Sequence, residues 1–145
     1  MSFIIESASE LAKKVIKIIE EKHPSRFIVG LCGDLGAGKT ALVKEIAKKL
    51  SVGQEITSPT FNILKTYYLP LNSLELKTMC HVDLYRLKRP GSLDLAEILD
   101  SIKQPKTISF IEWIENSPEI MKMADMIVEI SVISKNSRKV EIICK

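Results

Sequence analysis

The feature that most constrains this chain is a glycine-rich run, G-D-L-G-A-G-K-T, set between two regular apolar patterns. The run consists of Gly33, Asp34, Leu35, Gly36, Ala37, Gly38, Lys39 and Thr40. Residues 27–32 before it are almost wholly apolar, which is typical of a strand buried on both faces in a parallel sheet. Apolar residues after it recur at helical spacing between positions 42 and 50. This order of strand, glycine loop and helix predicts an α/β fold with a mostly parallel sheet flanked by helices.

The glycine run matches the phosphate-binding pattern G-x-x-x-x-G-K-[ST] in full. Its glycines allow backbone conformations in which several amides point at one phosphate, and the following helix adds its positive N-terminal end. We therefore expect all eight residues to hold the phosphates of ATP or GTP. Lys39 is expected to reach the β- and γ-phosphates, and Thr40 to give its hydroxyl to Mg²⁺. A chance match in a glycine-rich turn is the alternative, and the flanking strand and helix argue against it.

Two carboxylates stand where predicted strands end. Asp83 closes an apolar stretch that begins near Met79, and Glu112 closes the stretch that begins at Thr107. Ligands of open parallel sheets gather at the carboxyl ends of strands. Either carboxylate could bind the metal, directly or through water, or orient an attacking water. A solvated carboxylate at a strand end is the alternative for each alone, and the nearby glycine loop favours the functional interpretation.

Two further residues are weaker candidates. Thr60 lies in T-S-P-T-F, between the helix after the glycine loop and the Asp83 strand, where GTPases place a switch loop with a threonine that senses the γ-phosphate. On these residues alone, an ordinary turn set by Pro59 is favoured. Trp113 is the only tryptophan, and such a residue usually packs in a core or contacts a partner. Its place next to Glu112 leaves a position near the nucleotide open.

The remaining patterns fit one α/β domain spanning residues 1–145. Ser7 and Glu10 form a capping-box signature for a helix that should end near His23. Residues 126–133 and 139–143 alternate apolar and polar residues, which predicts a terminal hairpin. The stretch 51–76 is irregular, and its apolar residues 61–68 are expected in the core rather than on a partner surface.

Composition limits the class of protein. The net charge of +3 is too small to argue for direct nucleic-acid binding. Neither a signal peptide nor an apolar stretch of about 20 residues is visible, so we expect a cytoplasmic protein that does not bind membranes. Cys32, Cys80 and Cys144 lie in apolar runs, which predicts buried thiols in a reducing compartment. His23 and His81 are too isolated to suggest a zinc site.

Four segments together resemble one family. The segments G-D-L-G-A-G-K-T, S-P-T-F, H-V-D-L-Y-R-L and I-E-W follow one another between residues 27 and 113. In this order they resemble the bacterial TsaE (YjeE) proteins, small ATPases required for threonylcarbamoyladenosine synthesis on tRNA. The resemblance implies a P-loop NTPase fold with antiparallel strands at the C-terminal end. It also implies ATP and Mg²⁺ as cofactors.

The resemblance also implies roles for individual residues. Lys39 and Thr40 match the phosphate and magnesium residues, Glu112 matches a magnesium-site residue, and Asp83 matches an acid near the same site. Thr60 matches the switch-like threonine, and Arg138 resembles a hairpin arginine that contacts nucleotide. Relatives work with a threonylcarbamoyl-transfer complex of the TsaB–TsaD type, and reach tRNA through it. The resemblance implies that ATP hydrolysis drives or resets that complex.

We expect hydrolysis to be slow in the isolated chain. A charge-stabilising arginine is worth about 10³–10⁵ in rate at such sites. The chain has four arginines, Arg26, Arg86, Arg89 and Arg138, and none lies in a motif with that role. Two alternatives stay open: a small-molecule kinase, against which the few arginines argue, and a nucleotide-dependent switch without turnover. The preference for ATP over GTP is also open. The resemblance implies a nucleotide contact near the first helix, and the choice between Ser7 and Ser9 for it stays open.

Overall fold

The chain folds around one mixed sheet with helices on both faces. The computed structural model describes residues 1–57, 63–86 and 93–145. The described strands follow the order β1-β7-β6-β2-β5-β4-β3 across the sheet. The elements are β1 (Ser2–Ile5), α1 (Ala8–Lys22), β2 (Phe27–Cys32), α2 (Lys39–Lys49), β3 (Leu64–Tyr68), β4 (Thr78–Asp83), α3 (Leu93–Ile102), β5 (Thr107–Glu112), the 3₁₀ turn η1 (Ile114–Asn116), α4 (Pro118–Met123), β6 (Met126–Ser134) and β7 (Ser137–Cys144).

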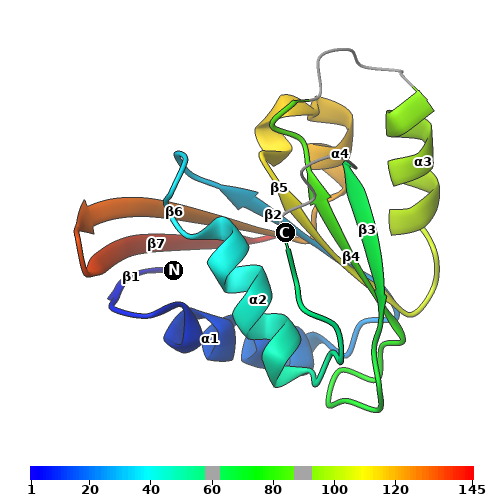
Figure 1. Cartoon of the computed structure of the whole chain (residues 1–145), viewed down its shortest axis with the longest axis horizontal. Helices are drawn as coiled ribbons and strands as arrows, with labels where there is room; N and C mark the ends of the chain where they lie inside the picture. The colour runs from blue at the N-terminus through cyan, green and yellow to red at the C-terminus, as the bar shows by residue number, and fades with distance from the viewer. Residues whose placement is uncertain (58–62, 87–92) are drawn as a thin grey trace.

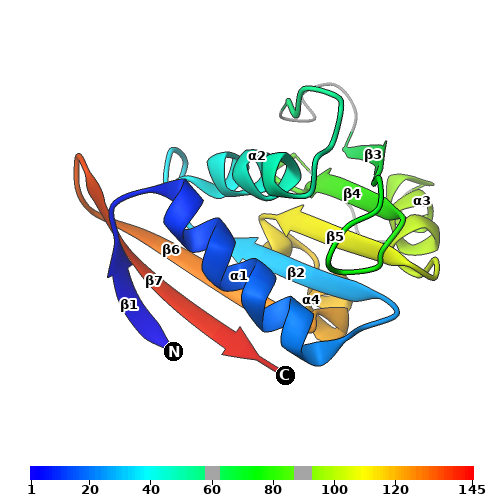
Figure 2. The ribbon, with the colours of Figure 1, turned by 90° about the horizontal axis from the view of Figure 1, so that it is seen from below.

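The middle of the sheet is parallel and its edges are antiparallel. Strands β6, β2, β5 and β4 run in the same direction. Strand β3 is antiparallel to β4, and β7 is antiparallel to both β6 and β1. Helices α1 and α2 cover one face, while α3 and α4 cover the other (Figures 1 and 2). The predicted fold class is therefore confirmed, and β3 adds an antiparallel strand at the second edge.

The alternation of side chains along β4 and β5 determines on which face of the sheet their polar residues lie. Met79 of β4 and Phe110 of β5 pack in the core beneath α1 and α2. Side chains two positions apart point to the same face of a sheet. His81, Asp83 and Glu112 therefore point to the face of α2, at the edge where the parallel strands end.

Most of the predicted elements are confirmed. Ser7 caps α1 by accepting a hydrogen bond from the amide of Glu10, and the helix ends at His23 in the left-handed conformation. The terminal hairpin is formed by β6 and β7, with Lys135 and Asn136 in its turn. None of the described helices has both the length and the apolar character that crossing a membrane requires.

Strand β3 and helix α4 were not predicted. Strand β3 lies inside the stretch expected to be irregular. It is an edge strand with a neighbour on one side only, so its apolar pattern is weaker than that of a central strand. Its Tyr67 is buried and its Tyr68 is exposed, so the expected core placement holds for only part of this segment. Helix α4 is short, and its signals were Ser117 as cap and Pro118 in its first turn.

The three thiols differ in exposure. Cys80 is buried and Cys32 is partly buried, but Cys144 is exposed at the end of β7, so the expectation of buried thiols is wrong for Cys144. Burial raises the pKa of Cys32 to about 12, and the negative charge of Glu115 adds to this rise. Burial also raises the pKa of Cys80.

These differences predict selective alkylation. The thiolate is the reactive form, so at pH 8 the fraction of Cys32 available for reaction is on the order of 10⁻⁴. N-ethylmaleimide should label the native protein once, at Cys144, and should label Cys32 and Cys80 only after unfolding. Mass spectrometry of peptides after timed labelling measures this. Rapid labelling of the native Cys144→Ser variant would contradict the prediction.

The first glycine of the loop is required by a close approach to β6. Gly33 has φ 147°, and a Cβ built on it would lie 2.5 Å from the carbonyl oxygen of Ile130. The same Cβ would lie 3.2 Å from Cβ of Ala37. Any larger residue must therefore move either the loop or the β6 backbone.

Gly33→Ala should lower the free energy of unfolding by about 1–3 kcal/mol, because it combines overpacking with an unfavourable φ. The control is Gly53→Ala, since a Cβ at Gly53 meets no atom within 4 Å. Urea unfolding of the two variants measures the difference. Equal stability of Gly33→Ala and the control would show that the loop adjusts at no cost.

Candidate functional site

The glycine loop leads directly into α2. Gly36 and Gly38 have φ values of 76° and 116°, in the left-handed region that glycine adopts readily. The amide of Ala37 donates to the carbonyl oxygen of Asp34 at 3.0 Å, which closes the turn. Gly38 is the N-cap of α2 and has no side chain that could accept from the first-turn amides. The positive end of α2 is therefore available to an anion.

Lys39 holds its ammonium group inside the loop. Its Nζ donates to the carbonyl oxygens of Gly33 at 2.5 Å and Asp34 at 3.0 Å. The same nitrogen lies 4.3 Å from the centre of the Trp113 ring. The side chain is only 5% exposed. Carbonyl dipoles and an aromatic face stabilise the cation without neutralising it, so the group remains able to pair with a phosphate oxygen.

Glu112 is a buried carboxylate held from two sides. It ends β5 and is 3% exposed. The Thr40 hydroxyl of α2 lies 2.9 Å from each of its two oxygens. Nε2 of His81, on β4, lies 2.5 Å from Oε2 of the same carboxylate. A helix and a neighbouring strand thus fix one carboxylate beside the start of α2.

Asp83 lies next to Glu112 in the sheet. The two residues are partners in the register of β4 and β5. Burial raises the pKa of the Asp83 carboxyl, the backbone amide of Tyr85 opposes this rise, and the charge of Glu112 adds to it. That amide donates to Oδ1 of Asp83 at 2.9 Å. Two carboxyl groups therefore share one edge of the sheet.

A cavity of about 390 Å³ joins these groups. It opens between the start of α2, the ends of β4 and β5, and the residues that follow those strands. Its lining comprises Leu35, Gly36, Gly38, Lys39, Thr40, Ala41, Asp83, Tyr85, Glu112 and Trp113. The structure thus brings Lys39, Thr40, Asp83 and Glu112 together at one cavity.

Trp113 forms one wall of this cavity. It has φ 58°, which is uncommon for a residue other than glycine, and its amide donates to the carbonyl oxygen of Leu31. Its ring lies 5.0 Å from the ring of Tyr85. The conformation turns the indole toward Lys39, so Trp113 lies at the predicted site rather than in the core alone.

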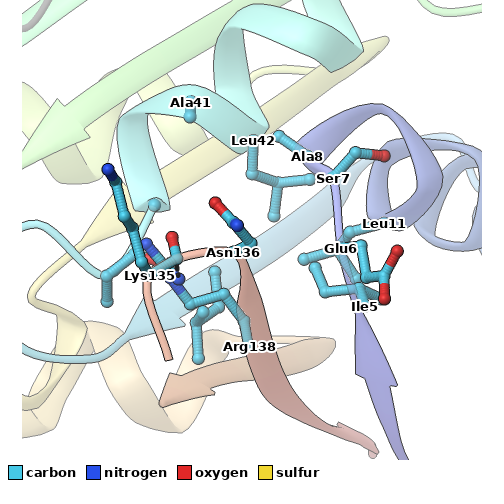
Figure 3. Close-up of a pocket in the computed structure, with 13 residues that line it drawn as sticks. Ile5, Glu6, Ser7, Ala8, Leu11, Ala41, Leu42, Lys135, Asn136 and Arg138 are labelled. Carbon is cyan, nitrogen blue, oxygen red and sulfur yellow. Dashed lines mark hydrogen bonds between the residues drawn. The ribbon is translucent and has the colours of Figure 1, made fainter. Parts of the chain in front are cut away.

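A second pocket, of about 250 Å³, lies on the other side of the loop. Figure 3 shows Lys135, Asn136 and Arg138 of the hairpin on one side and Ser7 on the other. Arg138 donates from Nε to the carbonyl oxygen of Ala37 at 3.0 Å, which ties the hairpin to the glycine loop. Its Nη1 donates to the carbonyl oxygen of Ser134 at 2.9 Å.

Several residues that were predicted to contact the nucleotide, and others that were not, do not line the first cavity. Thr60 is not among the described residues. Ser7 lines the second pocket, whereas Ser9 accepts a hydrogen bond from Lys49. Lys135 and Asn136 were not predicted, because turn residues of a hairpin carry no motif. On sequence alone, His81 is a histidine too isolated for a zinc site, although its spacing of two from Asp83 places it on the same face.

Comparison with known proteins identifies the family. Residues 5–140 match the sequence profile described as "Threonylcarbamoyl adenosine biosynthesis protein TsaE". The tRNA threonylcarbamoyladenosine biosynthesis protein TsaE of Haemophilus influenzae is 32% identical over 140 residues, covering 96% of this chain and 84% of the relative. The protein of the same name from Rickettsia felis is 35% identical, covering 97% of this chain and 78% of the relative.

A solved structure supports the fold. The crystal structure of Bacillus subtilis YdiB superposes with a TM-score of 0.62 and 22% sequence identity, covering 97% of this chain and 82% of that chain. At this identity the likeness concerns the fold alone. Because the family profile extends over nearly the whole sequence, the chain belongs to the TsaE family of threonylcarbamoyl adenosine biosynthesis proteins.

Proposed function

We propose that this protein is an ATPase that acts in tRNA threonylcarbamoyladenosine biosynthesis. The observation that carries the proposal is the convergence of Lys39, Thr40, Asp83 and Glu112 on one cavity at the end of the glycine loop. A cation, a hydroxyl and two carboxylates beside a helix N-terminus are the groups that phosphoryl transfer to water requires. Membership of the TsaE family supports the pathway.

The donor set fits a magnesium ion. Mg²⁺ prefers oxygen ligands and usually keeps several waters, so it needs only a few protein groups together with substrate phosphates. The Thr40 hydroxyl and the Glu112 carboxylate are such oxygens, 2.9 Å apart, and Asp83 faces the same cavity. Within the described residues, no three His, Cys, Asp or Glu side chains form a metal site by themselves. When bound, the ion neutralises charge on the phosphates.

The residues of the chain then have distinct tasks. Lys39 exchanges its carbonyl partners for a phosphate oxygen, which carries a full negative charge. The amides of the loop and the first turn of α2 hold the remaining phosphate oxygens. Thr40 and Glu112 would hold the metal, and Asp83 would orient water or bind the metal through water.

The second pocket is the proposed site for the rest of the nucleotide. It adjoins the first cavity, because Gly38 and Ala41 line both. Apolar side chains such as Leu11 and Leu42 can contact a base, and Asn136 offers both a donor and an acceptor. Arg138 lines the same pocket while it anchors the loop, in keeping with a hairpin arginine near the nucleotide.

We further propose that partners complete the site. Of the described residues that line the first cavity, Lys39 is the one with a positive charge. Leu35, 68% exposed, and the half-exposed Tyr85 lie at its rim, where a partner could bury them. A threonylcarbamoyl-transfer complex of the TsaB–TsaD type is the proposed partner. The protein would reach tRNA through that complex, in the cytoplasm and without a membrane.

Phosphate release tests this function. With Mg²⁺ and ATP, release should be slow for the chain alone and should rise when the TsaB–TsaD type complex and tRNA are added. Lys39→Ala and Glu112→Gln should each lower the stimulated rate by about 10²-fold or more, because each removes charge stabilisation. The control is Lys44→Ala, since Lys44 is exposed on the outer side of α2. Parallel assays with GTP measure the nucleotide preference.

Other results would favour the alternatives. Transfer of phosphate to a nucleoside or metabolite in an acceptor screen would support a small-molecule kinase. Tight nucleotide binding without multiple turnover, even with the partner complex present, would support a switch. Full activity of Lys39→Ala would contradict the proposed site altogether.

A further inference from the structure

We propose that His81 is a positioning residue that holds the Glu112 carboxylate in the orientation required for Mg²⁺. This inference rests on the proposed function, because it assigns His81 to the same metal site. His81 does not line the cavity and would not touch nucleotide or metal. It would act through the carboxylate that it contacts.

The histidine is placed directly behind the carboxylate. It lies on β4 in register with Phe110 of β5. Two residues further along these strands, on the same face of the sheet, Asp83 pairs with Glu112. Its side chain is 0% exposed, and its Nε2 lies 2.5 Å from Oε2 of Glu112. Because the carboxylate is an acceptor, the imidazole donates from Nε2.

The contact with Glu112 accounts for a polar side chain at this buried position. Within the described part of the chain, Nδ1 of His81 is buried and has no hydrogen-bond partner. A buried polar atom without a hydrogen bond is unfavourable, because it has lost its hydrogen bonds to water. An aliphatic residue between Met79 and Phe110 would avoid that cost, so packing alone does not favour a histidine here. The bond to Glu112 is the property that an aliphatic residue cannot supply.

Thr40 alone does not fix the carboxylate. Its hydroxyl has a single hydrogen, although it lies equally close to both oxygens of Glu112. Thr40 also follows a loop with three glycines at positive φ, and its oxygen would itself bind the metal. His81, in contrast, is carried by β4, which is paired with β3 and β5. The donor on the rigid strand therefore sets the orientation before the metal arrives.

The test is the affinity of the full-length protein for Mn²⁺ in the presence of ADP, followed by electron paramagnetic resonance. His81→Leu should weaken Mn²⁺ binding by about 10–100-fold, the usual effect of losing a group behind a metal ligand. His81→Gln should restore most of the affinity, because its amide nitrogen can donate where Nε2 does. ADP affinity in EDTA, measured through Trp113 fluorescence, should be unchanged in both variants.

A cycle with Glu112→Gln separates positioning from packing. In the Glu112→Gln background, His81→Leu should cause no further loss of Mn²⁺ affinity, because both act on one group. Should His81→Leu fail to fold, His81→Asn replaces it, since the shorter amide does not reach Glu112.

Each remaining outcome is decisive. Wild-type Mn²⁺ affinity in His81→Leu or His81→Asn would overturn the inference. The inference would also fail if His81→Gln lost as much Mn²⁺ affinity as His81→Leu or His81→Asn. Failure of the wild-type protein to bind Mn²⁺ with ADP would instead contradict the proposed function, on which the inference rests.

Discussion

The site depends on the register of three neighbouring parallel strands, β2, β5 and β4. Leu31 of β2 pairs with Glu112 of β5, and Glu112 pairs with Asp83 of β4. These pairs place both carboxylates in one row, on the face of α2 and at the edge where the glycine loop begins. A shift of one residue in either pairing would turn a carboxylate to the opposite face. The continuous apolar core of these strands therefore specifies the chemistry as well as the fold.

Burial of Glu112 links the core to the site. A carboxylate that is 3% exposed is stable only when hydrogen-bond donors replace water. The donors are Thr40, which follows the glycine loop, and His81, which belongs to the sheet. The same three residues thus satisfy a buried charge and hold the start of α2 against β5. Loss of either donor would disturb both the folded structure and the site.

The parts predicted from the sequence are those with local signatures. The run after β2 matches a motif, and apolar runs ending at Asp83 and Glu112 mark parallel strands and their carboxyl ends. The contact of His81 with Glu112 joins residues 31 positions apart, so it depends on a register that periodicity does not reveal. The second pocket combines Ser7 with Asn136, which only the antiparallel edge of the sheet brings together. Strand β3 was missed because its half-exposed pattern is weak.

The charges around the first cavity bear on how nucleotide and metal would bind. Lys39 faces two carboxyl groups, Asp83 and Glu112, across the same space. A polyphosphate entering alone would meet like charge there, and that repulsion would offset the attraction of Lys39 and the α2 N-terminus. A divalent cation held by Thr40 and Glu112 would reverse the sign of that interaction. Under the proposed function, nucleotide and magnesium therefore bind together, and a carboxylate held in a fixed orientation increases the coupling between them.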